Sequence, residues 1–169
     1  MGGDSPLSAA EFDEFFVRRS FDVARRALTH GNHPFGAILV DRNHNVLIEA
    51  ENGYMPSRDG TAHAERLLAT QACTTLSPDV LRHATLYSSA EPCAMCAGAI
   101  YWAGIGRVVY GQSEKDLKAQ TGAHDENPTL DLPCRRVFEA GQRPTEVVGP
   151  LLEDEAARLQ ADFWAAHTL

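Results

Sequence analysis

The chain has 169 residues, the length of one domain with one substantial core. Apolar residues make up 44% and charged residues 22% of the sequence, which excludes a disordered chain. The formal net charge of −8 disfavours a nucleic-acid substrate, because an acidic chain repels a polyphosphate backbone. No apolar run can cross a bilayer, and the polar start from Met1 to Pro6 is unlike a secretory signal. We therefore expect one cytoplasmic domain spanning residues 1–169, without a membrane anchor.

The expected elements begin with a helix, continue with a hairpin and then alternate between helices and strands. Ser8 and Glu11 have the spacing of a capping box, and Gly31 would end the helix that they begin. Apolar patterning and turn residues then predict, in chain order, strands at 37–40 and 46–48, a helix from Thr61, a strand at 85–88, a helix from Cys93, a strand at 107–110, a short helix at 114–119, a weak strand at 147–148 and a closing helix at 153–166.

This order predicts the fold class. Alternating strands and helices imply parallel strands with helices on both faces of the sheet, whereas the two strands of a hairpin are antiparallel. We therefore expect an α/β fold, a three-layer α/β/α sandwich around a mixed sheet of about five strands.

Two short motifs carry the chemistry, and each lies where a helix is expected to begin. Pro92 suits the start of a helix, so Cys93 and Cys96 should share one face of its first turn. The positive end of the helix dipole stabilises thiolates, the form of cysteine that binds metal. In the segment 61–65, His63 can supply a third ligand. Three protein ligands leave one tetrahedral position for water, which is typical of a catalytic zinc.

Glu65 completes this chemistry. It lies two residues beyond His63 and need not bind the same metal. A carboxylate beside a zinc-bound water, whose pKa the metal lowers toward neutrality, can take its proton and return it to the substrate. Such a site can replace an exocyclic amine with a carbonyl. The pattern therefore predicts a hydrolytic deaminase with one zinc per chain.

The cysteines have two other interpretations. A CxxC pair can be a redox pair, but such pairs lie near the first strand-to-helix turn of a thioredoxin-like unit and have no use for a His-x-Glu motif. A structural zinc would need a fourth ligand. Cys73 and Cys134 lack ligand-like spacing, and we interpret both as buried small residues. The histidines other than His63 we interpret as surface or loop residues.

The pattern H-x-E followed by P-C-x-x-C is the signature of zinc deaminases. From about Phe16 to Gly111 the sequence resembles the cytidine-deaminase superfamily, within it the branch of guanine deaminases and tRNA adenosine deaminases. The implied site has His63, Cys93 and Cys96 as zinc ligands, Glu65 as proton shuttle, and Asn52 and the backbone of Ala64 against the base.

Within this branch, two segments resemble guanine deaminases, in which aromatic residues line a closed pocket for a free base. They are residues 34–37 with Phe35 and residues 98–103 with Trp102; core packing is the alternative role for both aromatic residues. The tRNA enzymes usually have an aliphatic residue at the position of Phe35 and a basic last helix, whereas residues 153–169 carry a net charge of −3 here.

The segment 124–128 resembles the part of guanine deaminases that reaches the base from above the pocket, although a solvated loop is the alternative. Asp125 and Glu126 are the candidates in this segment for recognising the base. One carboxylate can accept hydrogen bonds from both N1–H and the 2-amino group of guanine. We therefore expect a small-molecule substrate, guanine converted to xanthine. Another or several small bases (cytosine, triazine analogues, adenine), a tRNA adenosine and a non-catalytic zinc-stabilised interaction domain are the alternatives.

The helix expected from Cys93 to Ala103 is apolar nearly all round. One face can cover the sheet of its own chain, and the excess predicts burial against a second copy. We therefore expect a homodimer, which the resemblance also implies.

Overall fold

The computed structural model describes residues 5–122 and 124–166, so the first four residues of the polar start lie outside the described range. The elements in chain order are α1 Ala9–Thr29, β1 Gly36–Val40, β2 Val46–Glu51, α2 Ala64–Thr75, α3 Pro78–Arg82, β3 Thr85–Ala90, α4 Ala94–Ala103, β4 Arg107–Gln112, α5 Glu114–Thr121, α6 Cys134–Glu139, β5 Glu146–Val148 and α7 Glu153–Ala166. Within these residues, no helix has the length and apolar character that a bilayer crossing requires.

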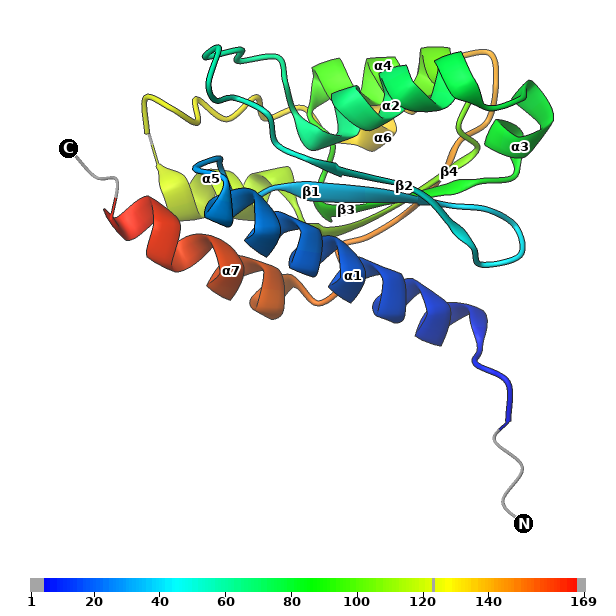
Figure 1. Ribbon diagram of the computed structural model, residues 1–169, viewed down its shortest axis with the longest axis horizontal. Coiled ribbons are helices and arrows are strands. Elements are labelled where there is room, and N and C mark those ends of the chain that lie inside the picture. The colour runs from blue at the N-terminus through cyan, green and yellow to red at the C-terminus, as the bar shows by residue number, and fades with distance from the viewer. Residues whose placement is uncertain (1–4, 123, 167–169) are drawn as a thin grey trace.

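The five strands form one mixed sheet in the order β2-β1-β3-β4-β5. Strand β1 is antiparallel to β2 and β3, whereas β3, β4 and β5 are parallel to one another. Helices α2, α4 and α6 cover one face of the sheet, and α1 and α7 cover the other (Figure 1). The predicted three-layer α/β/α sandwich with a five-stranded mixed sheet is confirmed.

Two apolar clusters hold the layers together, one on each face of the sheet. Successive side chains of a strand point to opposite faces, so Ala37 and Leu39 belong to the cluster beneath α2 and α4, and Ile38 and Val40 belong to the cluster against α1. Helix α1 lies so close to β1 that a Cβ on Gly36 would be 2.5 Å from the backbone nitrogen of Ala24. A residue without a side chain is therefore required there.

Four loops meet at one edge of the sheet. Because β1 runs opposite to β3, the segment before β1 lies at the same edge as the segments that follow β2, β3 and β4. Ligands of open α/β sheets bind outside the carboxyl ends of parallel strands, and β3 and β4 end here. The topology therefore brings His33 to Phe35, Asn52, Glu91 to Cys93 and Glu114 together.

The second helix begins at Ala64 rather than near Thr61, so that part of the prediction was wrong. The carboxylate of Asp59 accepts hydrogen bonds from the backbone N–H and the hydroxyl of Thr61, and Ala62 accepts one from the N–H of Gly53. These bonds hold residues 59–62 in a turn. His63 is the extended residue that caps the helix.

Candidate active site

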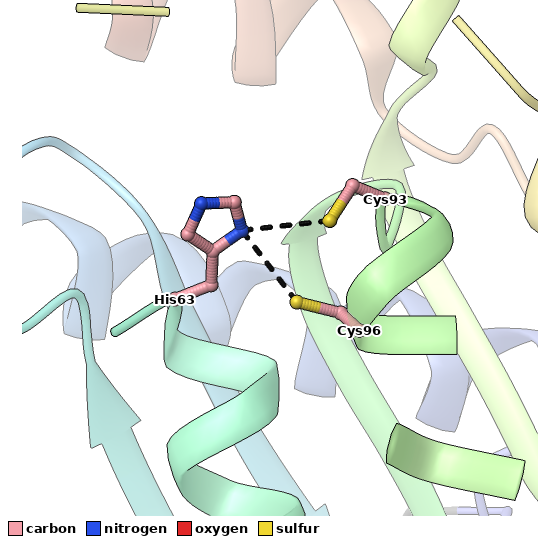
Figure 2. A group of neighbouring side chains, drawn as sticks. All are labelled: His63, Cys93 and Cys96. Atoms are coloured by element: carbon pink, nitrogen blue, oxygen red, sulfur yellow. Dashed lines mark hydrogen bonds between the residues drawn. The ribbon is translucent and has the colours of Figure 1, made fainter. Parts of the chain in front are cut away.

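Three side chains that can bind a metal meet where α2 and α4 begin. His63 is the N-cap residue of α2, Cys93 is the N-cap residue of α4, and Cys96 lies in the first turn of α4. The Nδ1 atom of His63 is 3.6 Å from the Sγ of Cys93 and 3.5 Å from the Sγ of Cys96 (Figure 2). All three ligand atoms lie within 4.8 Å of one another.

These separations fit a single zinc ion. Zinc binds imidazole nitrogen at about 2.0 Å and thiolate sulfur at about 2.3 Å, so a tetrahedral ion separates the two ligand atoms by about 3.6 Å. The measured separations agree with that value. Across residues 5–122 and 124–166, no other histidine, cysteine or carboxylate joins the group, which leaves a coordination position for a non-protein ligand.

The electrostatics of Cys93 also suit a metal. A hydrogen bond from the Cys96 thiol lowers the pKa of Cys93 to about 4, with a second contribution from the hydrogen bond to His63. The pKa of Cys96 is raised by its hydrogen bond with Cys93. The hydrogen bond with Cys93 also raises the pKa of His63. A thiolate is therefore favoured at Cys93, and thiolate is the form that binds zinc.

A small pocket, part of it open to solvent, lies against the metal site. It is lined by His33, Phe35, Asn52, His63, Glu65, Ala90, Glu91, Cys93, Glu114, Leu117, Glu126 and Asn127. Since His63 and Cys93 are part of its wall, an ion held by the three ligands is within reach of a molecule in the pocket.

Glu65 lies in the pocket wall and is only 5% exposed. The hydroxyl of Ser88, on β3, donates a hydrogen bond of 2.6 Å to its Oε1 atom. Burial raises the pKa of the Glu65 carboxyl group. The Ser88 hydroxyl thus fixes one carboxylate oxygen, and the carboxyl group also interacts with the thiol of Cys96.

The pocket brings together three other residues that the sequence indicated. Phe35 and Glu126 line it, as does Asn52, which is 5% exposed. The Oδ1 atom of Asn52 accepts a hydrogen bond from the backbone N–H of Tyr54, and this bond fixes the orientation of the amide. Among the described residues nothing accepts a hydrogen bond from its Nδ2 atom. Asn52 thus offers a donor to a bound molecule.

Trp102 and Asp125 lie outside the pocket lining, as does the side chain of Ala64. Trp102 is 84% exposed, because it is about 200° around α4 from buried Ile100. Asp125 is exposed and lines a different hollow, together with Lys115. Ala64 is fully buried in the core, so its side chain does not line the pocket. The structure therefore does not support a pocket position for Trp102 or Asp125.

Both remaining cysteines were predicted to be buried, which is confirmed for Cys134 and wrong for Cys73. Cys134 is buried at the start of α6. Cys73 is exposed, because the buried positions of α2 are Ala64, Glu65, Leu68, Ala69 and Ala72.

Two buried carboxylates of the pocket were not predicted. The carboxylate of Glu91 accepts hydrogen bonds from the backbone N–H groups of Glu114, at 3.0 Å, and Cys134, at 2.7 Å. Glu114 itself is 7% exposed, and burial raises its pKa to about 8. Glu91 directly follows β3 and Glu114 lies two residues after β4, so both stand at the ends of parallel strands, a position that could have marked them as site residues.

Residues 10–112 match the family model described as the cytidine and deoxycytidylate deaminase zinc-binding region. The chain belongs to this deaminase family. Its residues supply the family's zinc-binding group, His63, Cys93 and Cys96, in a geometry that fits the ion. The protein is therefore a zinc-dependent hydrolytic deaminase, as the sequence predicted.

Relatives of this deaminase differ in the substrates for which they are named. A probable cytosine deaminase of Schizosaccharomyces pombe is 42% identical over 160 residues, which cover 95% of this chain and 97% of the relative. A tRNA-specific adenosine deaminase of Haemophilus influenzae is 38% identical over 111 residues, 66% of this chain and 64% of the relative. The guanine deaminase structure from Nitrosomonas europaea has a TM-score of 0.74 and 26% identity, covering 98% of this chain and 99% of that one.

We predict that the purified protein holds about one zinc per chain and that Cys93→Ser or Cys96→Ser loses the ion together with activity, because a hydroxyl is a poor zinc ligand at neutral pH. Metal analysis by mass spectrometry measures both. Cys73→Ser, which changes the exposed cysteine of α2, is the matched control and should keep its zinc. Full zinc content in Cys96→Ser would contradict the assignment of the ligands.

Proposed function

We propose that this deaminase acts on a free nucleobase and converts guanine and water to xanthine and ammonia. The observation that carries the proposal is the carboxylate of Glu126 in the pocket wall, 3.0 Å from the Nε2 atom of His33. Guanine presents N1–H beside the 2-amino group that is lost, and one carboxylate can accept hydrogen bonds from both. Adenine would place the lone pair of its N1 against the same carboxylate, which is unfavourable.

Zinc held by His63, Cys93 and Cys96 would supply a water that is nucleophilic at neutral pH. We assign the proton transfers to Glu65, whose carboxylate lies in the pocket wall beside these ligands. Glu65 takes a proton from the attacking water and gives it to the ring nitrogen beside the reacting carbon. It then carries a proton to the departing amine, so that a C–O bond replaces the C–N bond and ammonia leaves.

The rest of the proposed pocket orients the base. Asn52 offers its amide N–H to a ring acceptor, and the ring of Phe35 provides an apolar wall. The backbone N–H of Ala64, at the start of α2, is the donor that the family resemblance implies. Helix α7 begins with Glu153, Asp154 and Glu155, an acidic turn that is unfavourable for a tRNA backbone.

Cytosine is the second candidate substrate, and the relative from Schizosaccharomyces pombe favours it, since the match covers nearly all of both chains. Cytosine is a single ring and carries the reacting amine on C4. The same zinc ligands and Glu65 could act on cytosine. The preference for one base over the other would then depend on Glu126 and the other residues that contact the base.

We predict that guanine is the preferred substrate in a panel of free bases, nucleosides and a tRNA anticodon stem-loop, with ammonia release as the measurement. The preference over adenine should be about tenfold or more, because adenine places the lone pair of its N1 against the carboxylate of Glu126. Faster turnover of cytosine than of guanine would replace the substrate and leave the metal chemistry intact. Turnover of the stem-loop alone would contradict the free-base proposal.

We predict that Glu65→Gln lowers kcat by about a hundredfold or more, because an amide cannot accept the proton of the water. The glutamine oxygen can still accept the hydrogen bond from Ser88, so fold and zinc content should be unchanged. Steady-state kinetics and metal analysis on the same preparation test this. Loss of zinc in the variant would make Glu65 a metal ligand, and normal turnover would move the proton transfers to another residue.

We propose that the outer face of α4 pairs with a second copy of the chain. Trp102 is 84% exposed there, whereas its neighbour Tyr101 lies beneath the guanidinium of Arg143 at 4.8 Å. An exposed tryptophan on an apolar helix is typical of an interface.

Light scattering at micromolar concentration should therefore give twice the 18.4 kDa mass of the chain, and Trp102→Ser should shift the mass toward the monomer. The matched control is Phe15→Ser, since Phe15 is an aromatic residue 49% exposed on α1, on the other side of the sheet. A monomeric mass for the unmodified protein would contradict the proposal.

A further inference from the structure

The contact between His33 and Glu126 joins two parts of the chain that are 93 residues apart. His33 lies in the loop before β1, and its side chain is only 11% exposed. Glu126 lies in the segment between α5 and α6, and its side chain is 48% exposed. Both residues line the pocket. The carboxylate on the more open side of the pocket is therefore held by an imidazole that is almost enclosed.

Aromatic rings hold the imidazole of His33 in place. The ring of Tyr54 stacks on it at 5.1 Å between centroids, and the rings of Phe163 and Trp164, both on α7, lie at 5.6 Å. The imidazole can therefore rotate little, which fixes the direction in which Nε2 points toward Glu126.

Helix α7 also fixes the backbone of this loop. Gln160 is 1% exposed, and its Nε2 atom donates a hydrogen bond of 2.6 Å to the carbonyl of Pro34. The indole N–H of Trp164 donates to the Oε1 atom of the same glutamine at 2.7 Å. The loop before β1 is therefore anchored, through Gln160, to a helix that contributes no side chain to the pocket wall.

The segment that carries Glu126 rests on the same helix. The backbone N–H of Glu126 donates to the Nδ1 atom of His124, and the ring of His124 lies 4.9 Å from the ring of Trp164. Trp164 thus contacts both partners of the pair, His33 directly and Glu126 through His124. The loop that carries His33 and the segment that carries Glu126 are therefore both held by α7.

We propose that His33 is a positioning residue that holds the carboxylate of Glu126 over the pocket, and that α7 sets the position of His33. The inference rests on the proposed function, in which Glu126 meets the base. It adds that base selection depends on a histidine outside the zinc-deaminase motifs and on the closing helix of the chain.

The test is a double-mutant cycle of His33→Ala, Glu126→Ala and the double variant, measured as kcat/KM for the base that the wild type prefers. A residue that acts through Glu126 has no effect once Glu126 is gone, so the double variant should match Glu126→Ala within about twofold. Each single variant should lose about tenfold or more. His33→Gln, which keeps an N–H donor, should recover most of the loss. Asp125→Ala should behave as wild type, because Asp125 is adjacent to Glu126 but lines a different hollow.

Hydrogen exchange on the free protein gives a second measurement that needs no substrate. Amide exchange at Glu126 and Asn127 should rise about tenfold or more in His33→Ala, because the segment loses its anchor, and should stay near wild type in His33→Gln. The control is His83→Ala, since His83 also faces a carboxylate, that of Asp79, at 3.6 Å, but lies after α3 and away from the pocket.

Two outcomes would overturn the inference: unchanged exchange at residues 126 and 127 in His33→Ala, or single-variant losses that multiply in the double variant. Normal guanine turnover by Glu126→Ala, together with faster exchange in His33→Ala, would instead show that Glu126 does not recognise the base. The contact between His33 and Glu126 would still hold the segment. Zinc content should be unchanged in every variant, since none of these residues touches the metal ligands. The two proposals therefore fail separately.

Discussion

The distance between the first turns of α2 and α4 is the constraint on which the site depends. His63 precedes Cys93 by 30 residues, and a single ion requires their ligand atoms to lie within a few ångströms. The two helices achieve this because they lie side by side on one face of the sheet (Figure 1). The core cluster beneath these helices includes the small residues Ala69, Ala72 and Ala97. Small residues permit close approach of helices, and a change that moved α2 and α4 apart would move the zinc ligands and the pocket wall with them.

Four glutamates surround the pocket, and their surroundings give them different roles. Each carboxylate oxygen of Glu91 accepts a hydrogen bond from a backbone N–H group. Glu91 therefore connects the loop that carries Cys93 to the starts of α5 and α6. Glu65 has one oxygen held by Ser88, and Glu126 is held by His33. Glu114 has a raised pKa, because it is buried among these other charges. Residues of one type thus differ in hydrogen bonding and in exposure according to their place around the pocket.

The sequence predicted what depends on local patterns. The capping box of Ser8 and Glu11 is present, the bounds of α7 agree, and the zinc ligands meet as the motifs indicated. Local patterns do not predict contacts between segments that are far apart in the sequence. The short helices α3 and α6 were not predicted. His33 lies in a loop, as predicted, but the sequence did not indicate that residues of α7 enclose its ring. Trp102, which the resemblance places in the pocket, lies instead on the exposed side of α4, about 200° around the helix from buried Ile100.

The hydrogen bond between Gln160 and Pro34 joins the last helix to a loop near the start of the chain. During synthesis, a chain that has emerged as far as Gln112 already contains β1 to β4, the three zinc ligands and Glu65. It still lacks Glu126 and the residues of α7 that fix His33. Because protein chains are made from the amino terminus, the residues for metal binding are available before those that shape the mouth of the pocket. A nascent chain therefore contains every zinc ligand before it contains the contact between His33 and Glu126.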